Sequence, residues 1–243
     1  MTIRRVLPVL LAAAPSAGVA QEAARLEAGV MSDWRVRGMS WSDGRPAAQL
    51  FASMPLGPGL DLAGQATTSR GSARHGGADA VLDVSGGYSS EAGLLRWHGG
   101  VAGHFFPGGS GAQDYVDLSL GGGAALGPLD LMVTAHYAPS QAAIGRSNLY
   151  TVADARIGLM GTPLTLAAHL GRSAGSISDR QRSDRLRPGG RYTDWSLGLD
   201  YAIRRLFFSI TYSDTSIDRR RTMPSGYADH AGATITFGAR FIM

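Results

Sequence analysis

Polar and apolar residues alternate with a period of two along most of this chain, most clearly in the segment 192–213. There Trp195 and Leu197 share one parity, while serine, glycine and aspartate residues occupy the other. Successive side chains of a strand point to opposite faces, so the pattern predicts a strand with one apolar and one polar face, and not a helix. The alternation resumes at Leu206 after a break at 202–205, which predicts an antiparallel hairpin with a short turn.

The same parity test predicts about twelve strands along the chain. Short turns alternate with longer polar loops that are rich in glycine and arginine, and the longest predicted loop is 173–191. The predicted apolar faces lie at 26–36, 48–54, 60–66, 80–88, 95–105, 116–120, 129–137, 149–159, 164–170, 193–201, 206–212 and 231–241.

This arrangement predicts an all-β fold, a transmembrane antiparallel up-and-down β-barrel of about twelve strands. An even number of strands of about ten residues, with short turns at one end and long loops at the other, is typical of outer-membrane barrels. Aromatic residues near the predicted strand ends fit the girdles found at membrane interfaces. A soluble sandwich or lipocalin-like barrel also alternates, but it turns its apolar face inward and does not sort its connections in this way. We therefore expect the apolar parity to face lipid and the polar parity to face the lumen.

The N-terminus predicts export. Two arginines, Arg4 and Arg5, precede an apolar run at 6–14 and small residues at 18–20. This pattern is typical of a cleaved signal peptide, residues 1–20, which leaves residues 21–243 as the barrel. A twin-arginine signal is the alternative, but the Val-Leu-Pro that follows the arginine pair fits it poorly. Beyond the signal, no apolar run approaches the roughly eighteen residues of a spanning helix.

Charge and cysteine content narrow the classes further. The chain carries a formal charge of +4. Removal of the two signal arginines leaves 4 − 2 = +2, too small an excess on an exported chain to predict nucleic-acid binding. There is no cysteine, so the exported protein is held together without disulfides.

The polar parity carries charged and histidine side chains that we predict to line the lumen. They are Arg35, Arg37, Asp83, Arg96, His98, His104, Asp117, His136, Asp154, Arg156, His169, Asp194, Asp200 and Arg240. No cofactor or metal is predicted, because no two histidines have ligand spacing along a strand. His98 and His104, six residues apart, would be separated by about 20 Å at about 3.3 Å per residue. A cross-strand grouping of His98, His136 and His169 stays open.

Arginines of the long loops are predicted to lie at the outer mouth. They are Arg180, Arg182, Arg185 and Arg187, followed in the next loop by Arg219, Arg220 and Arg221. They could focus a positive field and attract anionic solutes. Alternatively, they could bind the phosphates of lipopolysaccharide outside the pore, the role we favour slightly because long outer loops meet that phosphate layer in either case.

One short motif suggests catalysis but lacks its context. Gly171-Arg-Ser-Ala-Gly175 matches the nucleophile-elbow pattern, which requires a turn from a strand into a helix, and no helical periodicity surrounds it. We therefore predict that the protein is not an enzyme. Two alternatives remain open: an outer-membrane enzyme that acts on lipids, and a structural or adhesive barrel plugged by its own side chains.

Several segments carry a family resemblance. The segment Ser32-Asp-Trp-Arg-Val-Arg-Gly-Met-Ser40, with Asp43-Gly44 and Pro46-Ala-Ala-Gln49 after it, resembles the TorF-type porins. So do Tyr192-Thr-Asp-Trp-Ser-Leu-Gly-Leu199 and Tyr212-Ser-Asp214, and the resemblance spans nearly the whole mature chain. Trp41 stands where a polar residue is expected in that family. The resemblance implies an outer-membrane barrel with porin activity.

Together these observations predict a passive channel for small polar solutes in the outer membrane of a Gram-negative bacterium. Anions are candidate solutes. The predicted partners are outer-membrane lipid, lipopolysaccharide and the barrel-assembly machinery. Barrels of eight strands are filled by side chains and those of sixteen enclose an open pore, so about twelve strands predict a narrow lumen.

Overall fold

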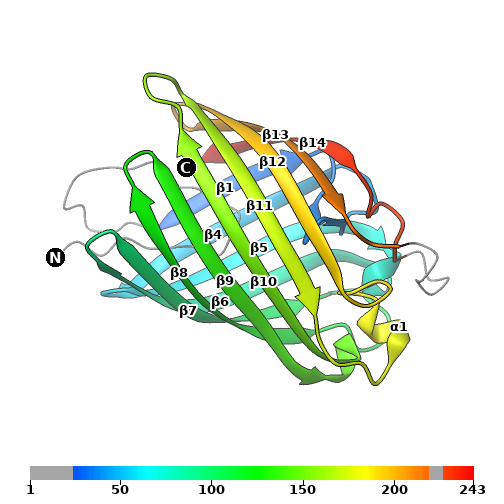
Figure 1. Cartoon of the computed structure of the whole chain (residues 1–243). Coiled ribbons are helices and arrows are strands. Elements are labelled where there is room, and N and C mark those ends of the chain that lie inside the picture. The colour runs from blue at the N-terminus through cyan, green and yellow to red at the C-terminus, as the bar shows by residue number, and fades with distance from the viewer. Residues whose placement is uncertain (1–23, 219–226) are drawn as a thin grey trace.

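The computed structural model describes residues 24–218 and 227–243, which form a closed antiparallel barrel of twelve strands (Figure 1). The barrel strands are β1 (Arg25–Met31), β4 (Ala47–Gly57), β5 (Leu60–Ser72), β6 (Ala78–Ala92), β7 (Leu95–Phe105), β8 (Tyr115–Leu126), β9 (Leu129–Gln141), β10 (Arg146–Gly158), β11 (Leu164–Ala174), β12 (Tyr192–Ile203), β13 (Leu206–Thr215) and β14 (Thr234–Ile242). Each strand pairs with its neighbours in sequence, and β1 closes the barrel against β14. The predicted all-β barrel is confirmed. The predicted signal peptide, 1–20, lies outside the described residues.

Strand pairing follows the alternation of the sequence. In the β12–β13 hairpin, Ile203 pairs with Leu206 and Leu197 with Tyr212, so apolar side chains meet on one face. That face is the outer surface of the barrel, where Leu197 is 57% exposed and Val30 is 60% exposed. An outer surface of this kind is stable in lipid, whereas in water it would be a large exposed apolar patch. Among the described residues, no helix is long and apolar enough to cross a membrane.

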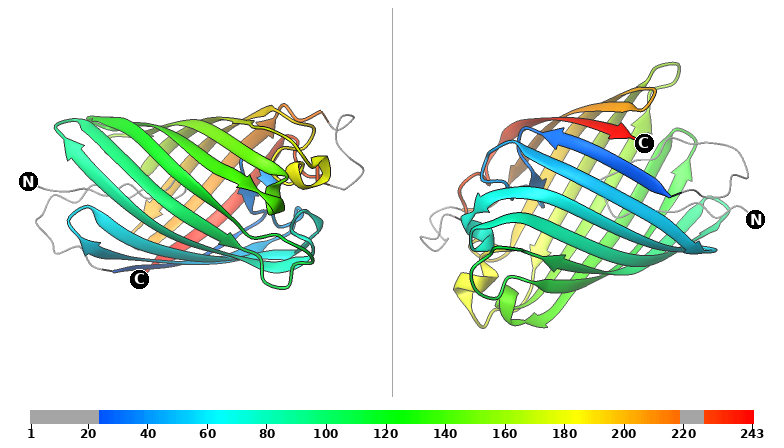
Figure 2. Two further views of the ribbon diagram at one scale, coloured as in Figure 1. Left: turned by 90° about the horizontal axis from the view of Figure 1, so that it is seen from below. Right: turned by 180° about the vertical axis from the view of Figure 1, so that it is seen from behind.

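The connections are sorted between the two ends of the barrel (Figure 2). At one end, which we call the turn end, short turns lie beside the first and last described residues. The turns are 58–59, 93–94, 127–128, 159–163 and 204–205. At the other end, which we call the loop end, lie two short connections, 73–77 and 142–145, and the long ones 32–46, 106–114 and 175–191, together with the described parts, 216–218 and 227–233, of the connection between β13 and β14. All the long loops lie at one end, as predicted, but 73–77 and 142–145 at the same end are as short as the turn 159–163 at the other end.

The first strand is shorter than predicted. It ends at Met31, and residues 32–46 form a loop with a small hairpin, β2 (Arg35–Val36) and β3 (Met39–Ser40). Positive φ angles of 53° at Arg37 and 74° at Gly38 make the two-residue turn between them, the geometry of a type I′ hairpin. Alternation continues through this hairpin in the sequence, but the hairpin is not part of the wall, so Arg35 and Arg37 do not lie on a barrel strand.

Other boundaries also differ at the loop end. The last strand begins at Thr234, and Ala231, predicted as its start, is 1% exposed among the loops. Strand β5 continues to Ser72 and β9 to Gln141, into segments predicted as loops. Backbone pairing extends there through small and polar residues that give no apolar alternation. Within 175–191 lies one short helix, α1 (Arg180–Ser183).

Candidate functional site

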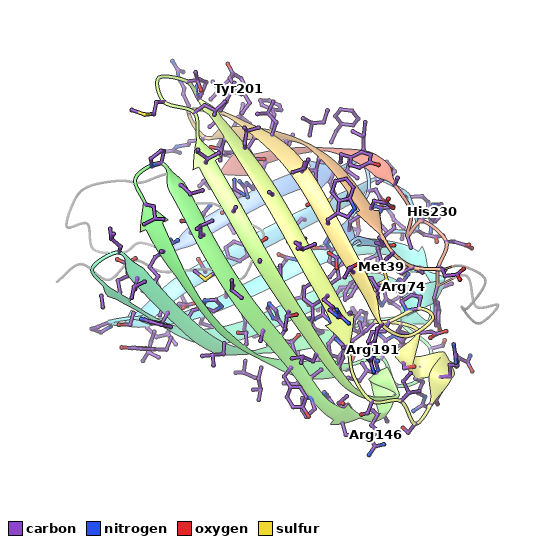
Figure 3. All side chains as sticks on the ribbon, in the orientation of Figure 1. Met39, Arg74, Arg146, Arg191, Tyr201 and His230 are labelled. Atoms are coloured by element: carbon purple, nitrogen blue, oxygen red, sulfur yellow. The ribbon has the colours of Figure 1, made fainter. Side chains whose placement is uncertain are left out.

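Side chains from the loops pack together over the loop end of the lumen. We call Trp34, Trp41, His75, Phe106, Ile144 and Leu186 the loop plug; all six are buried. The Trp41 and Trp34 rings meet edge-on at 5.3 Å between centroids, and His75 stacks on Phe106 at 4.6 Å. The last loop joins them through Arg74, whose guanidinium donates to the Tyr227 carbonyl. Figure 3 shows Arg74 and Met39 within the loop end, whereas Arg146 points away from the barrel.

Two of the arginines predicted at the mouth are buried. Arg185 donates to the carbonyls of Gln113 at 2.9 Å and Ala143 at 2.7 Å, and its guanidinium lies 5.0 Å from the Phe106 ring centre. Burial lowers the pKa of Arg185 to about 10, which leaves the group charged near neutral pH. Arg74 and Arg185 also donate to each other's carbonyls, at 2.6 and 3.1 Å. Arg185 therefore joins three loops through their backbones.

Of the other arginines predicted at the mouth, one is buried and two are exposed. Arg187 is buried and donates to the carbonyls of Gly175 at 3.0 Å and Ser176 at 2.9 Å. Arg180 and Arg182 lie on the surface of α1. Arg182 contacts Asp179 at 3.5 Å and donates to the Ala142 carbonyl. The residues 219–221, predicted to share this role, lie outside the described part of the chain.

His75 is held neutral inside the loop plug. Neither of its ring nitrogens has a hydrogen-bond partner within the described residues. Burial lowers the pKa of His75 well below its usual 6.5, and the neighbouring positive charges of Arg185 and Arg74 lower it further. Protonation would place a third cation in this buried cluster.

The β2–β3 hairpin reaches from the loop end into the lumen. Arg37 Nη2 lies 3.4 Å from Asp117 Oδ2 on β8, and the guanidinium lies 4.5 Å from the Tyr150 ring centre on β10. The hydroxyl of Tyr192, on β12, donates to the Arg37 carbonyl at 3.0 Å. A Cβ on Gly38 would lie 2.7 Å from Asp194 Cβ, so only glycine fits at this position. The hairpin tip thus contacts strands on separate parts of the wall.

Two histidines below the tip each lie between two carboxylates. His104 Nδ1 is 2.7 Å from Asp83 Oδ1, and its Nε2 is 3.5 Å from Asp117. The second cluster is His169 with Asp154 and Asp194. We call the two histidine clusters, together with Arg37, the tip site.

His169 repeats this arrangement on β11. Its Nδ1 is 2.7 Å from Asp154 Oδ1, and its Nε2 is 3.0 Å from Asp194 Oδ2. The Tyr150 hydroxyl donates to Asp194 at 3.0 Å and lies 2.9 Å from His169 Nε2. Such networks fix side-chain orientation in a lumen, because each charged group has a partner of opposite sign or a hydrogen bond. No group of three or more His, Asp or Glu residues in residues 24–218 and 227–243 is arranged to hold a metal ion.

Toward the turn end the interior is less enclosed. Arg156 pairs with Asp200, and Arg96 pairs with Asp130. Asp130 and Asp200 side chains are 42% and 27% exposed, against 5% for Asp117 and 1% for Asp194 at the tip site. Solvent therefore reaches Asp130 and Asp200 near the turn end, whereas Asp117 and Asp194 at the tip site are nearly inaccessible.

The remaining predicted residues have local partners. Arg240 lies 3.4 Å from Glu27, which also pairs with Arg25. His98 Nε2 is 3.4 Å from the Thr134 hydroxyl, and the His136 ring is 6.3 Å from that of Tyr150. The Tyr150 ring also lies 6.5 Å from that of His169, so it stands between His136 and His169. The three histidines form no metal-binding group among the described residues. Arg35 does not line the wall, since it donates to the carbonyls of Gly38, His230 and Gly232 and ties the hairpin to the last loop.

Some residues of this interior were not singled out from sequence. Tyr150 and Tyr192 share the parity of Asp154 and Asp194, so the alternation itself could have identified them. The motif 171–175 runs along β11 and out of it, and no helix follows directly. Its Ser173 is fully buried and donates to Asn148 Oδ1 at 3.1 Å. It therefore has the setting of a wall residue and lacks the exposed position of a nucleophile elbow.

Comparison with known proteins gives one family and a structural likeness. The sequence profile of a family described as "Bacterial protein of unknown function (Gcw_chp)" matches residues 14–240. The KdgM porin superposes with a TM-score of 0.58 at 9% identity, over 90% of this chain and 98% of that chain. Its complex with disordered oligogalacturonate gives a TM-score of 0.58 at 8% identity, with the same coverage. No curated protein matches the sequence. At these identities the structural matches establish a shared fold. None of the matches named here bears the TorF name, so that resemblance stays a prediction.

Proposed function

We propose a function on the premise that this chain belongs to the Gcw_chp family of bacterial proteins of unknown function. We infer that it is a narrow outer-membrane channel through which small polar solutes diffuse passively. The observation that carries this proposal is the sidedness of the barrel. Its outer surface is apolar, and its interior holds ionised and hydrogen-bonded side chains with solvent access from the turn end.

The outer membrane is the setting that fits this surface. In a bilayer every backbone group must be paired, a condition that a closed barrel meets. Short turns and both chain ends belong on the periplasmic side of such barrels, and long loops on the outer side. Export by the predicted signal peptide and insertion by the barrel-assembly machinery complete this proposal.

The exposed arginines near the loop end fit a role in lipid contact. Arg146, Arg172 and Arg191 are exposed on β10, on β11 and immediately before β12, and Arg180 and Arg182 lie on α1. Their guanidinium groups could form charge-assisted bonds to lipopolysaccharide phosphates in the outer leaflet. Burial of Arg185 and Arg187 favours this role over a ring of arginines that attracts anions into the mouth.

The loop plug favours a second candidate, a structural barrel that does not conduct. Its buried rings, together with the buried Arg74, Arg185 and Arg187 beside it, fill the described part of the loop end in this conformation. For the channel proposal, passage therefore requires the loops to move, and transport through the resting protein is expected to be slow and limited to small solutes.

Liposome swelling tests the two candidates. Liposomes containing the refolded protein are diluted into isotonic solutions of polyols and sugars of increasing size. A channel predicts swelling with small polyols, a steep loss of rate with oligosaccharides, and faster swelling for the double variant Trp41→Ala/Phe106→Ala. Empty liposomes are the control. If wild type and the double variant both swell at the rate of empty liposomes, the protein is a structural barrel.

A further inference from the structure

We propose that the tip site selects small cationic solutes, with ammonium or guanidinium groups, over anions. This inference rests on the proposed channel function. It differs from the expectation of anionic solutes, which depended on loop arginines. Of these, Arg185 and Arg187 are buried and Arg180 and Arg182 lie on the outer surface, while 219–221 lie outside the described residues.

The charge of the tip site is negative whichever way its histidines are protonated. Four carboxylates, Asp83, Asp117, Asp154 and Asp194, meet one guanidinium, that of Arg37. With neutral histidines the sum is 1 − 4 = −3, and with His104 and His169 both protonated it is −1. With the four carboxylates ionised, a cation is therefore attracted to the site in each of these histidine protonation states.

The described lumen as a whole, with the tip site included, has the same sign. Five arginines share the inward parity or the hairpin tip: Arg25, Arg37, Arg96, Arg156 and Arg240. Nine acids share it: Glu27, Asp61, Asp83, Glu91, Asp117, Asp130, Asp154, Asp194 and Asp200. Both counts leave out Arg146 and Asp79, which have this parity but are exposed at the loop end. Their sum is 5 − 9 = −4, and protonation of His104 and His169 brings it to −2. A lumen with low-dielectric walls focuses such a field and raises the local concentration of cations.

The tip site also contains hydrogen-bond acceptors without a donor among the described residues. Asp194 Oδ1 and Asp154 Oδ2 are buried and make no hydrogen bond within the described part of the chain. Their carboxylates flank the two nitrogens of the same imidazole, and the Asp194 side chain is 1% exposed. An ionised carboxylate only accepts hydrogen bonds, and buried polar atoms rarely stay unsatisfied. The group that completes them must carry N–H or O–H donors, which an ammonium group does and a chloride ion does not.

One donor of the tip site is also unsatisfied. Arg37 Nη1 has no acceptor among the residues that the structure describes. An amine with an oxygen atom nearby would satisfy both the carboxylates and this guanidinium. Small amino alcohols and amino acids that carry a net positive charge thus fit best among cations.

Reversal potentials in a gradient of potassium chloride test the inference. The full-length protein, refolded in a planar bilayer, is expected to show a reversal potential whose sign indicates that potassium permeates more readily than chloride. Asp154→Asn should lower the permeability ratio about fivefold, the Boltzmann factor for one unit charge about 4 Å from an ion in a water-like dielectric. Arg37→Gln should raise it.

Controls separate the tip site from general surface charge. Asp43→Asn removes the same charge from a loop residue whose side chain is 46% exposed, and should leave the ratio unchanged. If Asp154→Asn does not fold, Asp130→Asn near the turn end replaces it, and a smaller decrease is expected. Currents that prefer chloride, or equal ratios in wild type and the folded aspartate variant, would overturn the inference and leave the channel function standing. Absence of any current in wild type and in Trp41→Ala/Phe106→Ala would overturn both.

Discussion

Single residues decide how the lumen is closed, and Gly38 is the sharpest case. Its φ of +74° and the nearby Asp194 Cβ both exclude a side chain. Gly38→Ala should cost about 1–2 kcal/mol in backbone strain and also push the tip away from β12. We expect a higher single-channel conductance in this variant.

Gly93 provides the matched control for that substitution. It has a φ of +63°, and a Cβ there would meet no atom within 4 Å. Gly93→Ala should therefore lose stability by the same backbone strain, with unchanged conductance. Equal conductance in both variants would show that the tip does not limit passage.

We expect the loop plug to loosen in acid because of His75. Its pKa in the folded loops lies well below 6.5, so the opened loops bind the proton more tightly than the closed ones. The stability that neutral His75 gives to the plug is therefore complete above about pH 6.5 and is lost progressively as the pH falls below that value. The facing groups, Arg74, Arg185 and His104, are cationic or can become so, and they strengthen this trend.

Conductance measured between pH 7.5 and pH 4.5 checks this response. Wild type should conduct more as the pH falls. His75→Phe keeps a ring against Phe106 and Trp41 but cannot titrate, so its conductance should depend less on pH. An identical dependence of conductance on pH in the two proteins would show that His75 does not control opening of the loop plug.

At the scale of elements, buried arginines hold the loops together by hydrogen bonds to backbone carbonyls. Arg185→Ala would leave the carbonyls of Arg74, Gln113 and Ala143 without a donor, at about 1–3 kcal/mol for each one that stays buried. We expect faster amide exchange or proteolysis in the loops, with the barrel strands unchanged. Arg182→Ala, on the exposed surface of α1, should change loop protection little. Equal effects of the two substitutions would contradict this role for Arg185.

The elements also show how far the sequence could be interpreted alone. Period-two alternation identified the strands, because each wall residue faces either lipid or lumen. It failed at 32–40, where Trp34 and Val36 continue the parity of β1 inside a loop hairpin. Burial of Arg185 against carbonyls from three loops depends on contacts between distant segments, which local patterns do not contain. The pairing of His104 with Asp83 and Asp117 depends in the same way on strand register.

At the scale of the whole molecule, the barrel wall has an outer face in contact with lipid and an inner face in contact with the lumen, and we expect the two to respond differently to an added charge. Leu118 and Val101 lie on the outer face, and a charge there at mid-depth costs about 2–4 kcal/mol. Val101→Arg should therefore lower the free energy of unfolding in bilayers by about that amount, as measured by urea titration. Ala102→Arg, one residue further and facing the lumen, should cost less. Comparable losses would contradict the assigned faces.

The central claim is that a barrel with a wet interior is narrowed from within by the β2–β3 hairpin. Single-channel conductance tests it most directly, with wild type compared with a variant whose residues 35–40 are replaced by a Gly-Ser linker of equal length. We expect small, infrequent openings for wild type and a several times larger, steadier conductance for the variant, because the hairpin no longer occupies the lumen. Equal conductance in the two proteins, or none in either, would contradict it.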